Sequence, residues 1–367
     1  MRRAGEFGVR VGEPVVDLPA VVARKDEIVD SIRDGSYRAV ERAESMDHYP
    51  AEGRFVGPRR LRVGDTELEA DQIFLVTGMR TTVPAIDGLD AVPYHTSRTL
   101  LDLTELPEHL VVVGGGYIGC EFAQMFRRFG SRITLVQRAE RMLPGEDPDI
   151  SAAVADGFAA EGIEVRTGTA CVAVSGRAGD IRAGCAGERS DEVRGSHLLI
   201  AAGRTPNTDR LGLDLLGLEP ARSGFLPVDD ALRTPAEDVW ALGDIRGGGL
   251  FTHTARDDAD VVFRTVFRGQ DRSIAGRIVP HAVFVDPEVG AVGLTEPQTR
   301  AAGHDVIVGR QDFSGVAKAR ATGTTRGLIK FVVDAATDRI LGCHIAGPDG
   351  GNQGVNAAAG GVHRPAG

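Results

Sequence analysis

The sequence predicts an α/β protein with a parallel sheet, joined to a smaller α+β module. From residue 109 to 204, continuous apolar segments alternate with amphipathic helical segments, which is the pattern of consecutive βαβ units. From Pro280 onward, short strand-like segments and a final hairpin replace this alternation. Glycine accounts for 48 of the 367 residues, nearly twice the usual share of about 7%. This excess indicates many tight turns and close backbone approaches.

Length, charge and cysteine content narrow the class of protein. A chain of 367 residues suggests about two to three domains. The formal net charge of −10 argues against nucleic acid or an anionic membrane as the main partner. Four widely spaced cysteines make neither a disulfide scaffold nor a short-spaced dithiol. Without a signal-peptide core, or an apolar run near the ~20 residues that span a bilayer, a cytoplasmic location is expected.

The N-terminal part of the chain changes from helix to strand. Residues 15–45 are expected to form a helix, because Val21, Ile28 and Ile32 fall near one stripe with charges on the other faces. From about 53 to 77 the pattern predicts short strands, with the sequences GRFVG, RLRVG and DQIFLVTG.

The central region predicts strands and helices in strict alternation. The expected strands are HLVVVGG, SRITLVQ, GIEVRTG and HLLIAAG, and the first of the two intervening helices has the sequence YIGCEFAQMFRRFG. The second helix carries Ile150, Val154 and Phe158 on one stripe, and residues 170–195 predict polar hairpins. Residues 225–268 add a strand, DVWALGD, and a helix, ARDDADVVFRTVFRG.

The C-terminal module is expected to be a small strand-rich unit. Its segments are AVFVD, EVGAVGL, a short helix TEPQTRAAG, the strand DVIVGRQDF, and a hairpin that pairs GLIKFVVD with RILGCHIAG. From Gly347 to the end the chain has seven glycines and no apolar periodicity, which predicts a flexible tail.

A dinucleotide site is expected where the first central strand ends. Gly114, Gly116 and Gly119 occupy the three positions of G-x-G-x-x-G, and Tyr117 and Ile118 lie within the motif. The first glycine allows the tight turn, the second lets the backbone approach a pyrophosphate, and the third lets the helix pack closely. The helix N-terminus would face the phosphates. The alternative is an ordinary glycine-rich turn, which the ordered strand, motif, helix and second strand make less favourable.

The end of the second strand indicates which dinucleotide binds. An Asp or Glu there would bind the ribose 2′-hydroxyl of NAD, but this chain has Gln137, followed by Arg138 and Arg141. The missing carboxylate removes repulsion against a 2′-phosphate, and guanidinium groups can bind one. We therefore expect NADP rather than NAD. The alternative is that both arginines are ordinary surface charges.

Several motifs in order give the chain a family resemblance. They are IFLVTGMRTTVPAIDGLD, the glycine motif with its flanking strands, AAGRTPNT, TPAEDVWALGD, VFVDPEVGAVGLTE and GLIKFVVDAATDRILGCHIAG. Over about 15–346 the chain resembles the flavoprotein pyridine nucleotide–disulfide oxidoreductases, particularly the branch of mercuric reductase, dihydrolipoamide dehydrogenase and mycothione reductase.

The resemblance implies Rossmann-like FAD and NAD(P) domains and a C-terminal interface domain that forms a homodimer. The implied limits are 1–108 for part of the FAD domain, 109–224 for the NAD(P) domain, 225–279 for a second FAD segment, 280–346 for the interface domain and 347–367 for the tail.

The resemblance also assigns roles to individual residues. Thr77 and Gly78 match the turn that ends the first flavin segment, and Gly203 lies in the turn that closes the nucleotide domain. Asp244 follows an apolar strand, where a carboxylate can accept hydrogen bonds from ribityl hydroxyls; alternatively it caps a turn or the next helix. The remaining two implied positions are Glu121, on the nicotinamide side of the flavin, and His253, near the flavin ring.

Some hallmarks of the family are not found in this sequence. It contains no earlier G-x-G-x-x-G, no C-x-x-x-x-C redox pair and no terminal His-Pro…Glu segment. The chain is therefore expected to begin after the redox disulfide and not to reduce disulfides by itself. We interpret His363 as non-catalytic and the four cysteines as ordinary small side chains, and we expect no catalytic residue and no metal site.

The resemblance implies hydride transfer from NADPH to flavin, and then electron transfer to a disulfide or a metal ion. Two alternatives remain open at this point. The chain could be a non-catalytic NADP-binding remnant, or a flavin NAD(P)H oxidase or quinone reductase that needs no cysteines. The electron acceptor cannot be chosen from the sequence. Exposed apolar surface is expected where further flavin-domain structure would pack.

Overall fold

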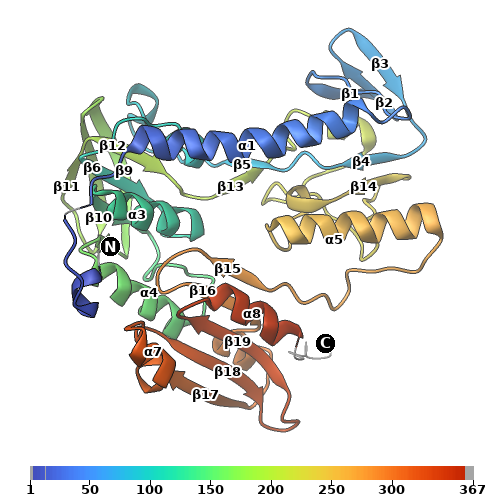
Figure 1. Cartoon of the computed structure of the whole chain (residues 1–367). Coiled ribbons are helices and arrows are strands. Elements are labelled where there is room, and N and C mark those ends of the chain that lie inside the picture. The colour runs from blue at the N-terminus through green and yellow to red at the C-terminus, as the bar shows by residue number, and fades with distance from the viewer. Residues whose placement is uncertain (1–2, 13, 360–367) are drawn as a thin grey trace. The chain divides into compact units, whose positions relative to one another are not determined.

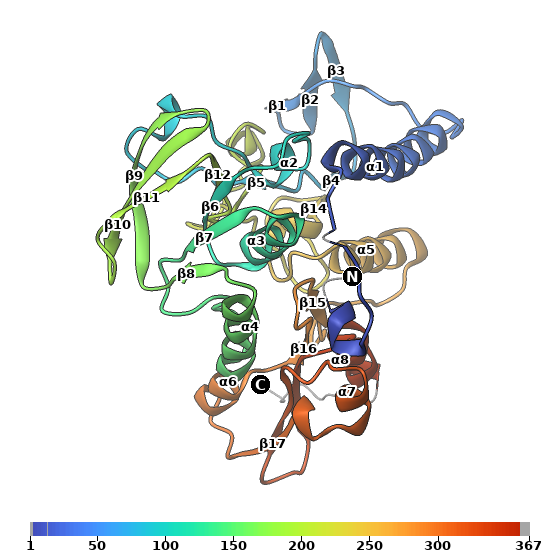
Figure 2. The same ribbon diagram turned by 60° about the vertical axis from the view of Figure 1, so that its left-hand side comes forward.

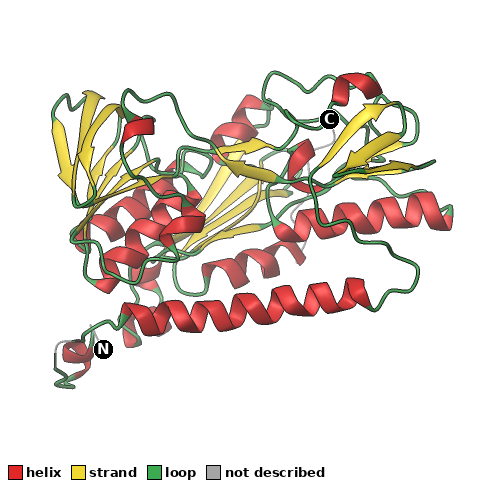
Figure 3. Cartoon of the chain, turned by 90° about the horizontal axis from the view of Figure 1, so that it is seen from above, coloured by secondary structure: helices red, strands yellow, loops and turns green. Residues whose placement is uncertain are grey.

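The computed structural model describes residues 3–12 and 14–359, which form two compact units (Figure 1). Unit 1 comprises Met1–Lys25, Thr82–Gly203 and Pro280–Gly367, and unit 2 comprises Asp26–Thr81 and Arg204–Val279. Helix α1 (Leu18–Glu41) is one continuous helix, as Figure 3 shows.

The apolar stripe predicted on α1 is not buried. Val21, Ile28 and Ile32 are all exposed, and Leu18 is the one residue of the helix that is buried. This exposed stripe agrees with the expectation of uncovered apolar surface on the chain.

The predicted parallel sheet forms the centre of unit 1, and this confirms the α/β fold. Its strand order is β12-β6-β7-β8, and all three pairings are parallel. Helices α3 and α4 connect β6 to β7 and β7 to β8 (Figure 2). The bounds of these elements are His109–Val113 (β6), Tyr117–Phe129 (α3), Arg132–Val136 (β7), Pro148–Ala160 (α4), Glu164–Arg166 (β8) and His197–Ile200 (β12).

The two faces of this sheet contact different partners. Leu110 and Val112 of β6 pack with α3 and α4 in one apolar core, whereas Val111 and Val113 join a second core with β9, β10 and β11. This alternation is expected of a strand that is covered on both sides. The strands β9 (Thr169–Arg177), β10 (Asp180–Gly187) and β11 (Glu192–Gly195) form an antiparallel meander, which confirms the hairpins expected over 170–195.

The C-terminal part of unit 1 is a five-stranded antiparallel sheet with the order β15-β16-β19-β18-β17. Short helices accompany it. The bounds are His281–Val283 (β15), Val289–Gly293 (β16), Glu296–Ala301 (α6), Val306–Asp312 (β17), Ala317–Ala321 (α7), Leu328–Asp334 (β18), Ile340–Ala346 (β19) and Gly350–Ala359 (α8), while α2 (Ser97–Leu100) precedes the parallel sheet.

The prediction of a flexible tail from residue 347 is wrong for α8. A Cβ atom on Gly290 of β16 would lie 1.9 Å from the carbonyl oxygen of Gly350, and one on Gly354 would lie 3.2 Å from the Gly290 backbone. The helix therefore packs through glycines in close backbone contact, which leaves no apolar periodicity in the sequence to find. Residues 360–367, including His363, lie outside the described part of the chain.

A buried lysine joins the parallel sheet's second helix to the C-terminal sheet. Lys330 of β18 is 2% exposed, and its Nζ lies 2.9 Å from Asp147 Oδ1, 2.7 Å from Asp149 Oδ2 and 2.8 Å from Glu296 Oε2. Burial alone would lower the pKa of Lys330, but the carboxylates outweigh it and raise the pKa well above its usual range. The lysine therefore stays charged inside the protein.

Unit 2 contains three small sheets, helix α5 and the larger part of α1. Strands β1, β2 and β3 form an antiparallel meander, β4 pairs in parallel with β14, and β5 pairs antiparallel with β13. Helix α5 is followed by one π-helical turn. The bounds are Gly53–Gly57 (β1), Arg60–Val63 (β2), Thr66–Glu69 (β3), Ile73–Leu75 (β4), Met79–Thr81 (β5), Arg204–Pro206 (β13), Val239–Ala241 (β14), Thr252–Val262 (α5) and Phe263–Phe267 (the π-helical turn).

The compact units divide the chain at positions other than the implied limits of 108/109 and 224/225. Within unit 1, Asp87 forms a bridge with Ala173 and His95 forms one with Leu199, so the segment from Thr82 packs with the parallel sheet. Residues from Arg204 belong to unit 2, because β13 pairs with β5. Strand pairing sets these limits, and strand partners are not visible in a single sequence.

We expect Lys330→Met to lower the free energy of unfolding by roughly 3–5 kcal/mol, because it leaves the fully buried Asp147 carboxylate without its cation. Urea unfolding followed by circular dichroism measures the change. Arg264→Met is the control, since its ion pair with Asp260 is partly exposed, with 44% and 43% of the two side chains accessible. A wild-type unfolding curve for Lys330→Met would contradict this account of the network.

Candidate functional site

The glycine motif forms a tight turn between β6 and α3. Gly114 has φ +113°, and a Cβ atom there would lie 2.3 Å from the carbonyl oxygen of Ala201. On Gly119 a Cβ atom would lie 1.8 Å from the carbonyl oxygen of Gly114. On Gly116, by contrast, it would meet no atom within 4 Å. The first and third glycines are thus required by packing, whereas the second leaves open space beside the backbone, as close approach of a pyrophosphate requires.

The first turn of α3 faces this open space without a side-chain cap. Its N-cap residue is Gly116, and no side chain accepts a hydrogen bond at this helix end. Tyr117 and Ile118 begin the helix, and Ile118 packs against the core. Free N–H groups and the positive end of the helix dipole make such a terminus suitable for an anionic group.

The end of β7 carries the three residues expected to distinguish NADP from NAD. Gln137 is buried, and its Oε1 accepts a hydrogen bond of 3.1 Å from the Gly115 N–H. Arg141 donates to the Pro144 carbonyl oxygen at 2.9 Å. Arg138 is exposed, and its guanidinium makes no hydrogen bond or ion pair with the described residues. Gln137 therefore supports the turn itself, while the two arginines lie at its outer side.

A polar cluster that was not predicted from the sequence holds Tyr117. The Tyr117 hydroxyl donates to Glu146 Oε1 at 2.5 Å, and His281 Nε2 lies 2.7 Å from the same oxygen. Burial favours protonation of Glu146, but the hydrogen bonds from His281 and Tyr117 outweigh it and lower its pKa. The cluster joins the start of α3 to β15. Because Glu146 and His281 are 135 positions apart, only the structure brings them together.

Glu121 also contacts the C-terminal module. Its Oε1 accepts a hydrogen bond of 2.9 Å from the Phe284 N–H. Burial raises the pKa of Glu121, and this hydrogen bond opposes the rise. Gly203 is the last residue of the segment Thr82–Gly203, which contains the parallel sheet, and it has φ +132°. Its carbonyl oxygen accepts a hydrogen bond of 3.0 Å from the Thr82 N–H.

In unit 2, the turn at Thr77 and Gly78 is hydrogen-bonded to Asn207, which lies in the AAGRTPNT motif. Asn207 donates its side-chain N–H to the Thr77 carbonyl oxygen at 2.9 Å and its backbone N–H to Gly78 at 3.0 Å. Gly78 has φ +63°, a conformation that glycine adopts without strain. Two motifs that the sequence separates by 130 positions therefore form one structure.

Asp244 lies directly after β14, where the second flavin motif ends. Its carboxylate is half-buried and makes no hydrogen bond or ion pair within the described residues. The three glycines that follow, Gly247–Gly249, all have positive φ and form a loop before α5. His253 is exposed and stacks on Phe251, with ring centroids 5.5 Å apart. Within the described residues, the N-cap of the next helix, α5, is Phe251 and not Asp244.

A buried ion-pair cluster, also missed from the sequence, supports this loop. Asp258 is fully buried and accepts hydrogen bonds from the Gly243 N–H at 2.9 Å and from Arg246 at 2.6 and 2.7 Å. Arg277 donates to it at 2.8 Å. Burial favours protonation of Asp258, but these donors outweigh burial and lower its pKa. Asp258 therefore fixes the backbone on both sides of Asp244.

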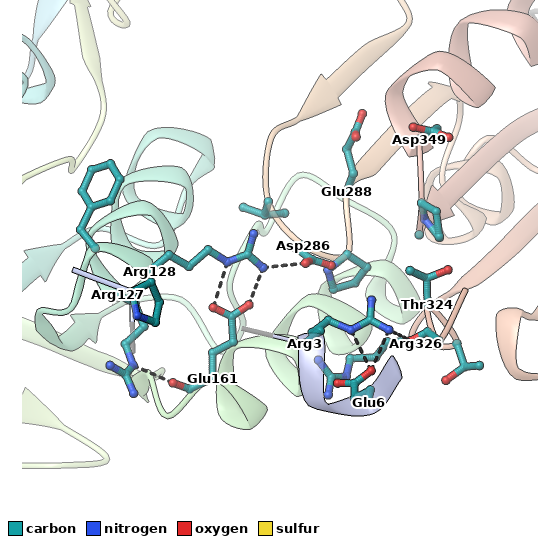
Figure 4. Close-up of a pocket in the computed structure, with 18 of the residues that line it drawn as sticks. Arg3, Glu6, Arg127, Arg128, Glu161, Asp286, Glu288, Thr324, Arg326 and Asp349 are labelled. Carbon is teal, nitrogen blue, oxygen red and sulfur yellow. Dashed lines mark hydrogen bonds and ion pairs between the residues drawn. The ribbon is translucent and has the colours of Figure 1, made fainter. Parts of the chain in front are cut away.

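A cavity of unit 1 lies elsewhere, at the other end of α3 (Figure 4). It has a volume of about 1170 Å³ and is lined at one side by the C-terminal ends of α3 and α4. There Arg128 binds Glu161 at 2.6 Å and Asp286 at 2.6 Å. The cavity lies at the C-terminal end of α3, opposite the glycine turn. The negative end of the helix dipole at this end disfavours phosphate. The dinucleotide is therefore not expected in this cavity.

Asp258→Asn is expected to destabilise unit 2 by roughly 3 kcal/mol at neutral pH, because two buried arginines lose their shared carboxylate. The lowered pKa means that the wild-type ion pair stabilises above the ordinary value of 3.8 and is lost as the pH falls below it. The difference between the two proteins should therefore shrink in acid. Urea unfolding followed by fluorescence of the single tryptophan, Trp240, measures it.

Asp260→Asn, on the same helix but partly exposed, is the control and should differ little from wild type at any pH. A difference between Asp258→Asn and wild type that stays constant or grows in acid would contradict the assigned ion pair.

Within the described residues, no helix is long and apolar enough to cross a bilayer, and no group of three or more His, Cys, Asp or Glu side chains is arranged to hold a metal ion.

Comparisons with known proteins agree with the geometry. Residues 6–259 match the family "Pyridine nucleotide-disulphide oxidoreductase", and residues 279–361 match its dimerisation domain. The chain is 35% identical to mercuric reductase of Streptomyces lividans, covering 94% of this chain and 74% of that protein. It is 34% identical to dihydrolipoyl dehydrogenase of Chlorobaculum parvum, over 95% and 75%.

Among solved structures, the flavoprotein disulfide reductase RclA from Escherichia coli superposes with a TM-score of 0.86 at 33% identity, over 94% of this chain and 79% of that one. The family uses FAD and NAD(P)H. On its sequence, its fold and its glycine turn, this chain belongs to the pyridine nucleotide-disulphide oxidoreductase family.

Proposed function

We propose that this chain binds NADPH at the glycine turn of unit 1 and FAD at the Asp244 loop of unit 2, and that it carries out hydride transfer between them. The open space at Gly116, next to the uncapped N-terminus of α3, is the observation that carries the proposal. Bound flavin would supply the chemistry that accepts a hydride from the nicotinamide and passes electrons onward.

The residues of unit 1 would bind the dinucleotide as follows. Gly114 and Gly119 hold the turn, and backbone N–H groups at Gly116, Tyr117 and Ile118 donate to the pyrophosphate. In the family the residue at the position of Glu121 lies on the nicotinamide side. Arg138 and Arg141 would bind a 2′-phosphate, and no acidic side chain at position 137 opposes it. This arrangement supports NADPH over NADH.

The residues of unit 2 fit a flavin. The half-buried, unpartnered Asp244 carboxylate can accept hydrogen bonds from ribityl hydroxyls, and the Gly247–Gly249 loop lets the backbone approach the ligand. Thr77, Gly78 and His253 would contribute to the same site. Through the region matched at 279–361, we also propose that the protein is a homodimer.

A direct test is the absorbance spectrum of the purified chain after incubation with FAD and desalting. We expect retained flavin near stoichiometric amount and bleaching of its band by NADPH without oxygen. Asp244→Ala should lose the flavin but still bind NADPH. Gly116→Ala should retain the flavin but raise the Kd for NADPH at least about tenfold, because the new methyl group occupies the phosphate position.

The outcomes separate the alternatives. A colourless wild-type protein that binds NADPH would contradict the flavin site and indicate a nucleotide-binding module. NADPH oxidation with oxygen or a quinone in a variant without cysteines would indicate the oxidase-type activity. Unchanged NADPH binding by Gly116→Ala would contradict the nucleotide site itself.

Selectivity for NADPH has its own test. Replacing Arg138 and Arg141 together by alanine should raise the Kd for NADPH by on the order of tenfold or more, because charge-assisted bonds to the phosphate are lost. The Kd for NADH should not change. Arg182→Ala, an exposed arginine on β10, is the matched control. A wild-type preference for NADH in fluorescence titrations would refute the assignment.

A further inference from the structure

Two cysteines of unit 1 lie directly opposite each other on neighbouring strands. Cys171 of β9 pairs with Cys185 of β10 in antiparallel register. The Cys185 N–H donates to the Asp191 carbonyl oxygen at 3.0 Å, on the β11 side, and so points away from β9. The two residues therefore form a non-hydrogen-bonded pair directly beside a β-bulge, because the register shifts between Gly184 and Cys185. Opposite side chains are closest in pairs of this type. The Cα spacing of such pairs falls within the range that a disulfide can bridge.

Both side chains point to the same face of the meander. Each is 8% exposed, and both belong to the core that covers Val136 at the end of β7. Both are free thiols, with each sulfur 3.8 Å from a carbonyl oxygen of its own strand.

The other two cysteines have no thiol opposite them within the described residues. Cys120 lies on α3, and its sulfur contacts the Gly115 carbonyl oxygen. Cys343 of β19 lies between Val292 and Phe331 of the adjacent strands. Both are fully buried, more deeply than the pair, and so reaction at either of them would report unfolding of the chain.

We propose that Cys171 and Cys185 form a redox-sensitive pair that closes to a cross-strand disulfide on reaction with a small-molecule disulfide. One thiolate attacks the disulfide, forms a mixed disulfide and releases one thiol. The second protein thiol, as thiolate, then displaces the other half of the reagent. Two protein thiols become one protein disulfide, and the reagent is reduced to two thiols. This inference does not depend on the proposed function.

The surroundings of the pair indicate how pH affects disulfide formation. Burial raises the pKa of Cys171 to about 11. Burial also raises the pKa of Cys185, but the Arg166 guanidinium opposes that rise, while Asp191 and Glu164 add to it. Because the thiolate is the nucleophile, closure should accelerate as pH rises above neutral. Low exposure means that the reagent enters through local opening of the hairpin.

Closure would fix the strands close to the nucleotide turn. Cys171 is two residues after Thr169, whose N–H donates to the Gln137 carbonyl oxygen at 3.0 Å. A covalent link at this position holds the β9–β10 register beside the end of β7, and we expect the oxidised protein to have the higher unfolding midpoint.

The experiment uses the full chain incubated with oxidised glutathione, quenched in acid, alkylated under denaturing conditions and digested with trypsin. The expected product joins peptide 167–177 to peptide 183–189 and disappears when a reductant is added before alkylation. Its yield after a fixed time should be higher in mildly alkaline than in neutral buffer. Cys120 and Cys343 should remain fully alkylated.

Variants give the inference a second readout. Cys171→Ser and Cys185→Ser should each abolish the linked peptide and the rise in unfolding midpoint, and each remaining cysteine should carry glutathione or stay free. Linked peptides that include Cys120 or Cys343 would overturn the proposal, because they indicate reaction of unfolded chain. So would single glutathionylation or full alkylation of both cysteines in the wild-type protein.

Discussion

One buried carboxylate holds unit 1 together. Asp147 is fully buried, begins α4 by accepting a hydrogen bond from the Asp149 N–H, and also binds the Glu296 N–H and the Lys330 ammonium. A charge in the interior is tolerated only with such a complete set of donors. Three parts of the chain, α4, α6 and β18, must therefore be in place together. The polar cluster of Tyr117, which joins α3 to β15, depends on the same arrangement.

The candidate site depends on a different constraint, the absence of side chains. At Gly119 and Gly114 the backbone of α3 and the turn approach so closely that no Cβ atom fits, and α8 packs on β16 in the same way. Close contact at the turn aligns the free N–H groups of α3 with the open space at Gly116. In unit 2 a buried charge, rather than a small residue, holds the backbone next to Asp244. The Asp258 carboxylate accepts a hydrogen bond from the Gly243 N–H.

The parts of this architecture that were predictable from sequence are those with local signals. The stripe of Ile150, Val154 and Phe158 and the three glycines of the turn are recognisable within a few residues, since periodicity and turn geometry act over short distances. Two polar contacts join residues that are far apart in sequence, namely Glu146 with His281 and Lys330 with Asp147. No pattern within a few residues predicts such contacts. Asp258 was hidden for another reason, because an acidic residue on a helix is usually solvated. Helix α8 was not predicted, because it packs through glycines and its sequence therefore has no apolar periodicity.

The pairing of β5 with β13 has a consequence for the segment of chain that lies between these two strands. A hydrogen bond of 3.0 Å joins Thr82 and Gly203, the first and last residues of the segment between these strands. A stretch whose two ends meet in this way can be inserted into a host fold, or removed from it, without stretching the remaining backbone. Exchange of this segment would also require the C-terminal module, because Asp147 and Glu121 within the segment bind Lys330, Glu296 and Phe284 of that module.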